Sequence, residues 1–253
     1  MGKFDDKSVL ICYAGGGIGM AAAELFEKEG ATVIVHDDSE EKLENVPGEK
    51  FIGDLRNKEE ADKLIEFAVE KGGGKLDVIV NNEDFVVERA KLEDITTDQF
   101  REMCNLNLKT IWNTLAAMYP KMKAQKGNLN IVNVGHIDGA AGHTRLIDYS
   151  SVKAGLFGLT KTVAKEWSRF QTVRCNAVNY GYVKFKDPYV NQGPRGKRGI
   201  KDFSGPLNPL ANYAKFKPQD IAEIILFLAS DASKAINAEV VNASGGMYTV
   251  SGE

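Results

Sequence analysis

Cysteine and histidine are scarce in this sequence, whose 253 residues include only three of each. The cysteines, Cys12, Cys104 and Cys175, are odd in number, far apart and without the spacing of metal ligands. They therefore argue against a disulfide framework and against a bound metal. Scattered thiols in strand-like or helical segments are typical of a reducing compartment, so we expect buried free cysteines and a cytoplasmic protein.

The sequence also lacks long apolar runs and a strong excess of charge of either sign. No apolar run approaches the roughly 20 residues that cross a bilayer, and residues 1–7 are too polar for a signal peptide. The formal net charge of −3 gives no reason to expect binding to nucleic acid or to a membrane surface. With 43% hydrophobic residues, the composition is that of a globular protein with a full core.

The stretch from Ser8 to Asp38 predicts a strand–helix–strand unit. A short apolar run, 9–12, is typical of a strand buried on both faces, and a glycine cluster, 15–19, follows it directly. An amphipathic helix pattern and a second β-branched strand come next. Glycines at such a turn direct backbone N–H groups and a helix N-terminus toward a pyrophosphate. Asp37, at the end of the second strand, is placed for a ribose hydroxyl pair, so the unit predicts dinucleotide binding.

Strand and helix patterns continue to alternate along the rest of the chain. The further predicted strands span 50–52, 78–80, 131–134, 173–178 and 239–242, and the further helices span 40–45, 58–70, 98–126, 147–169 and 218–230. This alternation predicts an α/β fold: a Rossmann-type, doubly wound parallel sheet of about seven strands with helices on both faces. Because the sequence has no linker and no repeat, we expect a single domain over 1–253.

One segment, 184–216, has no clear period and contains two Gly-Pro pairs and Pro209. A loop of this length inside a compact domain is usually a lid or a substrate-binding loop. Its basic stretch, Arg195 to Lys201, has two interpretations that the sequence leaves open. It is either a solvated face or a contact for an anionic ligand.

Tyr149 and Lys153 form a Tyr-x-x-x-Lys pair one turn apart on a predicted helix, so they share a face. An ammonium beside a phenol favours the phenolate and can lower a pKa that is normally near 10. Such a pair suits proton transfer linked to hydride transfer. Together with the glycine turn, it resembles the short-chain dehydrogenase/reductase family, and the resemblance covers essentially the whole chain. The other residues that carry the resemblance are Asp37, Asp54, Asn81, Asn82 and Asn107.

The resemblance implies an NAD-dependent oxidoreductase that acts on a secondary alcohol or ketone. In the family, the tyrosine is the general acid/base, the lysine lowers its pKa and holds the nicotinamide ribose, and an asparagine helps to hold a relay water. His136 stands where the family has a serine, and an imidazole N–H can also donate to a carbonyl. The candidate catalytic residues are therefore Asn107, His136, Tyr149 and Lys153.

The resemblance also implies a cofactor site. Asp37 corresponds to the acid that selects NAD, since a 2′-phosphate would meet it as a like charge, and Asp54 matches a residue near the adenine. Each acid has the alternative interpretation of a solvated strand end, and Lys153 that of a surface ion pair. The candidate cofactor-binding residues are Gly15, Gly17, Ile18, Gly19, Asp37, Asp54, Asn81 and Lys153.

Several positions depart from the family pattern. Tyr13 replaces the first glycine of the turn and is expected to crowd the pyrophosphate, Tyr180 replaces a proline, and Glu83 and Asp84 replace Ala-Gly. An uncompensated buried carboxylate costs several kcal/mol, more than ribose hydrogen bonds return at roughly 1 kcal/mol each. We therefore expect NAD to bind this chain weakly or not at all, and to be bound by a partner subunit instead.

Two functions are compatible with these retained residues and these departures. The chain is either an active NAD-dependent dehydrogenase with His136 in place of the serine, or a non-catalytic subunit that supports an active short-chain dehydrogenase in a hetero-oligomer, as a tetramer. We favour the second, which resembles the heteromeric hydroxyacyl-CoA dehydrogenase of the benzylsuccinate pathway. Assembly would use the helices over 98–126 and 147–169. The substrate would be a small ketone or alcohol, for which a CoA thioester is one candidate.

Overall fold

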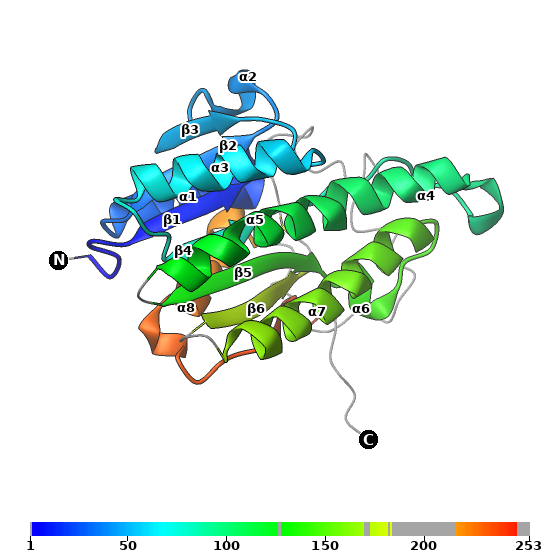
Figure 1. The fold of residues 1–253 in the computed structure, drawn as a ribbon. Coiled ribbons are helices and arrows are strands. Elements are labelled where there is room, and N and C mark those ends of the chain that lie inside the picture. Colours follow the sequence, from blue (N-terminus) through cyan, green and yellow to red (C-terminus); the bar gives the residue numbers. More distant parts are fainter. Residues whose placement is uncertain (1, 126–127, 170–172, 182, 184–215, 247–253) are drawn as a thin grey trace.

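The computed structural model describes residues 2–125, 128–169, 173–181, 183 and 216–246, which form a seven-stranded sheet flanked by helices (Figure 1). The strands are β1 Ser8–Cys12, β2 Thr32–Asp37, β3 Glu49–Ile52, β4 Val78–Asn81, β5 Leu129–His136, β6 Val173–Tyr180 and β7 Val240–Ala243. Their order is β3-β2-β1-β4-β5-β6-β7, and all neighbours are parallel. The order reverses between β1 and β4, as in doubly wound folds. The predicted Rossmann-type sheet is therefore confirmed.

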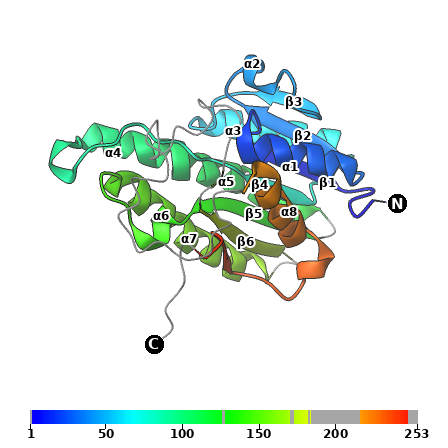
Figure 2. The same cartoon turned by 180° about the vertical axis from the view of Figure 1, so that it is seen from behind.

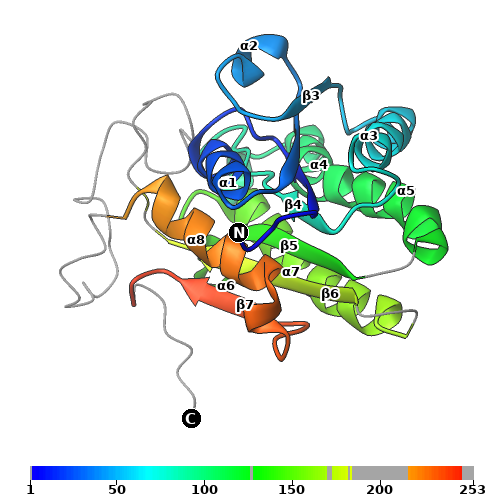
Figure 3. The ribbon, with the colours of Figure 1, turned by 90° about the vertical axis from the view of Figure 1, so that its left-hand side faces the viewer.

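Helices cover both faces of the sheet (Figure 3). One face carries α1 (Gly17–Lys28) and α8 (Pro218–Ala229), which lie in front when the molecule is seen from behind (Figure 2). The other face carries α3 (Lys58–Lys71), α5 (Thr110–Ala124) and α7 (Ile147–Trp167). The shorter helices are α2 (Glu40–Leu43), α4 (Thr97–Cys104) and α6 (Asp138–Ala141). This arrangement places the carboxyl ends of all the strands at one edge, where parallel sheets bind their ligands.

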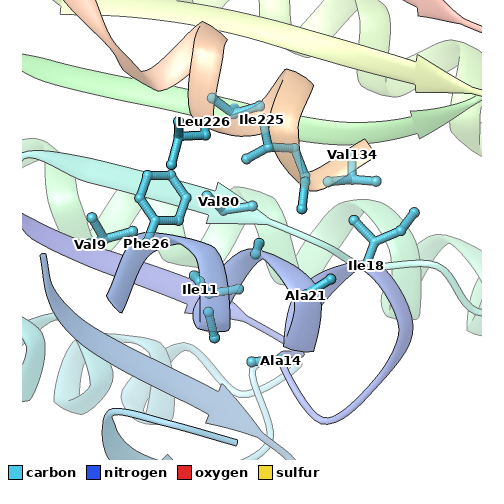
Figure 4. Close-up of a cluster of buried hydrophobic side chains, with 14 of the residues drawn as sticks. Val9, Ile11, Ala14, Ile18, Ala21, Phe26, Val80, Val134, Ile225 and Leu226 are labelled. Atoms are coloured by element: carbon cyan, nitrogen blue, oxygen red, sulfur yellow. The ribbon is translucent and has the colours of Figure 1, made fainter. Parts of the chain in front are cut away.

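Alternate residues of β1 face the two helical layers. Val9 and Ile11 pack with α1 and α8, and Figure 4 shows them beside Phe26. Leu10 and Cys12 pack with the helices of the other face. All four strand positions are fully buried, because successive side chains of a strand point to opposite faces and both faces are covered. This explains the unbroken apolar sequence of the strand.

The predicted single helix over 98–126 is divided. It consists of α4, a π-helical segment from Asn105 to Lys109, and α5, which contains Pro120. A π-helical turn widens a helix locally and is frequent at functional sites. The sequence pattern did not predict it, because hydrophobic spacing hardly distinguishes one extra residue in a turn. It did not predict α6 either, since four residues are too few to establish a period.

Some predictions concern segments beyond the described residues. The expected lid over 184–216 lies outside them except at Phe216, so the lid, its basic stretch and the single domain over 1–253 stay predictions. Two of the three cysteines, Cys12 and Cys175, are buried thiols, whereas Cys104 is partly exposed. Among the described helices, none has the length and apolar character needed to cross a membrane.

Candidate active site

The candidate site lies at the carboxyl edge of the sheet. His136 and Tyr180 are the last residues of β5 and β6, and these two strands are paired up to that point. Asp84 follows β4 closely, and α7 contributes Tyr149 and Lys153. The fold therefore brings together residues that are up to 96 positions apart in the sequence.

Tyr149 and Lys153 are fully buried, with 1% and 0% of their surfaces exposed. The Lys153 ammonium nitrogen lies 5.5 Å from the centre of the Tyr149 ring, and the His136 ring centre lies 5.8 Å from it. Three of the four predicted catalytic residues therefore meet. His136 Nδ1 lies 3.2 Å from the backbone nitrogen of Asp138 and 3.3 Å from a carboxylate oxygen of the same residue.

Asp84 lies against the predicted catalytic pair. The Tyr149 hydroxyl donates to Asp84 Oδ1 at 2.5 Å, and the Lys153 ammonium lies 3.3 Å from the same oxygen. The Tyr180 hydroxyl donates to Asp84 Oδ2. Burial by itself would raise the pKa of Asp84, but Lys153, His136 and the two phenols outweigh it and hold that pKa well below its ordinary value. Asp84 is thus a largely buried, ionised carboxylate.

The pKa of Tyr149 differs in direction from the expectation for a Tyr-x-x-x-Lys pair. Burial, followed by the negative charge of Asp84, raises the pKa of Tyr149 well above its ordinary value. The adjacent ammonium of Lys153 does not reverse this shift, because it is bound to Asp84 and to the Glu83 carbonyl oxygen. In this arrangement Tyr149 is a protonated phenol.

Asn107, the fourth predicted catalytic residue, contacts the backbone rather than the other three. Its side chain donates to the Phe85 carbonyl at 2.9 Å and accepts from the Phe85 N–H at 2.9 Å. It also donates to the Met103 carbonyl at 3.2 Å. Asn107 is fully buried in the π-helical segment, so it fixes the chain next to Asp84.

Glu83 is a second buried acid beside the site. It has no exposed surface, and burial raises its pKa to about 8, against smaller lowering effects of its own backbone N–H and of Lys153. Glu83 is therefore mostly protonated at neutral pH.

The glycine turn after β1 is held by Asp37. The Asp37 carboxylate accepts a hydrogen bond of 2.9 Å from the Gly15 N–H and lies 3.2 Å from the Lys42 ammonium. A side chain at Gly15 would collide with Asp37 and Lys42, at 2.6 and 2.5 Å. Burial raises the pKa of Asp37, while these donors lower it. The carboxylate that the resemblance assigns to the ribose thus binds the protein's own turn.

Tyr13 adopts a left-handed backbone conformation, with φ of 53°, which a tyrosine rarely does. Its ring lies 4.9 Å from both His36 and Phe85, edge to face with each. It belongs to the hydrophobic core on the α3 and α5 face of the sheet. The ring fills the space between His36 and Phe85, and the expected crowding of a pyrophosphate by Tyr13 stays a prediction.

The remaining predicted cofactor residues have structural contacts. Gly17 begins α1 with φ of 56°, and Ile18 packs in the core under that helix (Figure 4). Gly19 admits the close approach of the Asn82 amide and the Tyr13 carbonyl, each 2.7 Å from where a Cβ would lie. Asp54 and Asn81 are bound by side chains: Arg56 pairs with Asp54 at 2.8 Å, and Asn81 donates to Asn133 at 2.8 Å.

The sequence identifies Asp84 and Tyr180 as departures from the family pattern but does not predict that they belong to the site. Their unusual identity was the only signal, because their contacts link segments 96 residues apart. Within the described part of the chain, no three histidine, cysteine or acidic residues are grouped to hold a metal ion.

The doubly wound sheet, the glycine turn after β1 and the Tyr-x-x-x-Lys pair on α7 define a dinucleotide-dependent oxidoreductase fold. Residues 14–248 match a family described as enoyl-(acyl carrier protein) reductase. The chain is 34% identical to 3-oxoacyl-[acyl-carrier-protein] reductase FabG of Thermotoga maritima, over 97% of this chain and 99% of that protein. It is 32% identical to dehydrogenase/reductase SDR family member 6 of Rattus norvegicus, over 97% and 99% of the two chains. The chain therefore belongs to the short-chain dehydrogenase/reductase family of oxidoreductases.

Solved structures agree with this assignment. Levodione reductase superposes with a TM-score of 0.83 at 25% identity, covering 96% of this chain and 98% of that chain. A 3-ketoacyl-(acyl-carrier-protein) reductase from Brucella melitensis, complexed with NADH, gives the same TM-score and coverage at 23% identity, which supports the fold.

Proposed function

We propose that this chain is a non-catalytic subunit of an NAD-dependent oxidoreductase that acts on a secondary alcohol or ketone, and that it supports an active short-chain dehydrogenase partner. The observation that carries the proposal is the position of Asp84. Its carboxylate accepts a hydrogen bond from the Tyr149 hydroxyl and forms an ion pair with the Lys153 ammonium. These are the two groups that the family uses for proton transfer and for the nicotinamide ribose. A phenol that donates to an internal carboxylate is not available to a substrate carbonyl.

Weak or absent binding of NAD is part of the proposal. The Asp37 carboxylate already accepts from Gly15 and pairs with Lys42, and the Tyr13 ring fills the space between His36 and Phe85. A cofactor would have to displace these contacts as well as Asp84, and each displaced charged group would lose its partners. These internal contacts support weak or absent binding of a nicotinamide dinucleotide by this chain.

Assembly with a partner would use the outer side of α5 and α7. A hollow of about 860 Å³ lies there, and its lining includes Leu108, Trp112, Leu115, Tyr119, Val163 and Trp167. Trp112 is 64% exposed, and exposed apolar patches of this kind typically mark interaction sites. We propose that an active short-chain dehydrogenase chain covers this hollow, in a tetramer that contains both chains.

A second candidate function is that of an active NAD-dependent reductase. The Lys153 ammonium and the His136 ring each lie within 6 Å of the Tyr149 ring centre, and a protonated Tyr149 is the form that gives a proton to a carbonyl. The relatives favour this candidate more than the first, because their names are those of reductases. It would require Asp84 to leave Tyr149, with His136 orienting the ketone of a small substrate or a CoA thioester.

Titration of the purified chain with NADH, followed by nicotinamide fluorescence, separates the two candidates. If the chain is a non-catalytic subunit, NADH binding should not saturate below about 10 μM, which corresponds to a binding free energy of roughly −7 kcal/mol. Saturable binding at or below that concentration would favour the active enzyme. NADPH serves as the comparison, and it should bind more weakly still, because its 2′-phosphate would approach Asp37 and Asp38 as like charges.

A further inference from the structure

Three donor groups converge on the two oxygens of a single carboxylate. Oδ1 of Asp84 receives the Tyr149 hydroxyl at 2.5 Å and faces the Lys153 ammonium at 3.3 Å, and Oδ2 receives the Tyr180 hydroxyl. All three donor residues are at least 98% buried. The donors come from α7 and from the end of β6. Asp84, the acceptor, comes from a different segment, the one that follows β4.

The donors are held in place independently of Asp84. Lys153 also donates to the Glu83 carbonyl oxygen, and the Tyr180 ring packs edge to face on His136 with centres 4.9 Å apart. The His136 ring therefore contacts the rings of both Tyr149 and Tyr180. A preorganised set of one ammonium and two phenols suits a carboxylate, because charge-assisted hydrogen bonds to an anion are about twice as strong as neutral ones.

We propose that Tyr149, Tyr180 and Lys153 form a carboxylate-binding site, which Asp84 fills from within the chain and which a small-molecule carboxylate occupies when Asp84 is displaced. The proposal concerns binding and does not depend on whether the chain is catalytic. Asp84 competes as an intramolecular ligand, so its effective concentration exceeds that of any free carboxylate at ordinary levels. Asn107 strengthens this competition, because its contacts with the Phe85 backbone fix the residue next to Asp84.

The substitution Asp84→Gly provides the test, because the side chain that it removes differs from acetate by one hydrogen. We expect the folded variant to melt at a lower temperature than the wild type, since Lys153 loses a buried partner. Sodium acetate should restore the melting temperature saturably, and calorimetry should detect acetate binding. Acetamide, which has the same shape without the charge, and sodium chloride at equal ionic strength should do neither. The wild type and Asp84→Asn, whose sites remain filled, should not bind acetate.

Tyr180 provides the second arm of the experiment. In the Asp84→Gly background, Tyr180→Phe should weaken acetate binding about tenfold, as expected for the loss of one hydrogen bond to a charged group. If Asp84→Gly does not fold, Asp84→Ala with formate replaces it, since formate fits the smaller space. The proposal is overturned if acetate and acetamide act equally, if a folded variant does not bind acetate or formate, or if Tyr180→Phe leaves the affinity unchanged. The NADH titration measures binding of a different ligand, so the acetate experiment can fail or succeed independently of it.

Discussion

The Tyr149 hydroxyl donates a 2.5 Å hydrogen bond to Asp84, a residue 65 positions earlier in the chain. The family to which the chain belongs has a glycine where Asp84 stands, so the bond has no counterpart in the family pattern. Burial of the ring, and after it the Asp84 carboxylate, raise the pKa of Tyr149 and keep the phenol protonated. The site thus contains the family's residues in an arrangement of its own.

Replacing both Tyr13 and Asp84 by glycine should improve NADH binding. The double change removes the ring between His36 and Phe85 and the carboxylate on Tyr149 and Lys153, and it restores the glycines of the family pattern. We expect at least a tenfold gain in affinity by fluorescence titration, equivalent to about 1.4 kcal/mol. If the double variant folds and binds NADH no better than the wild type, other residues block the site.

Glu83 should make the stability of the chain depend on pH. Its pKa is raised from 4.5 to about 8 by burial, so the folded chain keeps a proton that the unfolded chain loses. The stabilising contribution is therefore complete below pH 4.5 and falls as the pH rises toward about 8. Glu83→Gln, which cannot ionise, should remove this decline, as measured by urea unfolding at several pH values.

An exposed acid serves as the control for that experiment. Glu24→Gln, on the outer side of α1, should leave the decline of the wild type in place. If Glu83→Gln loses stability between pH 5 and 8 as the wild type does, a different group titrates and the assignment to Glu83 is wrong.

Asn107 should stabilise the segment that carries Asp84. Asn107→Ala removes hydrogen bonds to both backbone groups of Phe85, and we expect a loss of about 2–3 kcal/mol in the free energy of unfolding, together with faster hydrogen exchange at the Phe85 amide. Asn105→Ala is the matched control, because Asn105 lies in the same π-helical segment and its side chain donates to the Glu102 carboxylate instead of to Phe85. Equal effects of the two substitutions would mean that the helix, not the Phe85 contact, is responsible.

The hollow on α5 and α7 should be an assembly surface. Trp112→Glu places a charge in it, and the complex should dissociate toward smaller species, as seen by light scattering at micromolar concentration. Leu92→Glu is the control, since Leu92 is 66% exposed and does not line the hollow. A wild-type chain that is a monomer at that concentration, and that is recovered from its host without a second chain, would refute the assembly proposal.

Much of the fold could be predicted from local sequence, because each strand and helix carries its own period. The apolar run of β1 and the glycine turn placed the first strand–helix–strand unit correctly, and Tyr149 and Lys153 are one turn apart on a helix, so their proximity is a local property. The contacts of Asp84 with Tyr149 and Tyr180 are not local. They depend on how far β4 and β6 extend and on the π-helical turn that positions Asn107, and no spacing in the sequence encodes these features.

Contacts between distant segments also explain why the pKa of Tyr149 is raised and not lowered. The sequence shows an ammonium four residues away, which would lower the pKa. It does not show that the ammonium is bound to Asp84 and the Glu83 carbonyl oxygen, nor that the phenol faces a carboxylate. A pKa is set by all neighbours in space, and most of these neighbours come from other strands.

The substitution Tyr149→Phe tests the central claim most directly, when turnover is measured on the complex purified from its own host. It keeps the ring and removes the hydroxyl that a catalytic tyrosine needs, whose loss is typically worth about 10²–10⁴ in rate. With the change in this chain and assembly intact, we expect turnover to remain nearly unchanged, whereas the corresponding change in the partner should abolish it. A loss of more than about tenfold from Tyr149→Phe in this chain would contradict the account, because this chain's own site would then perform the chemistry.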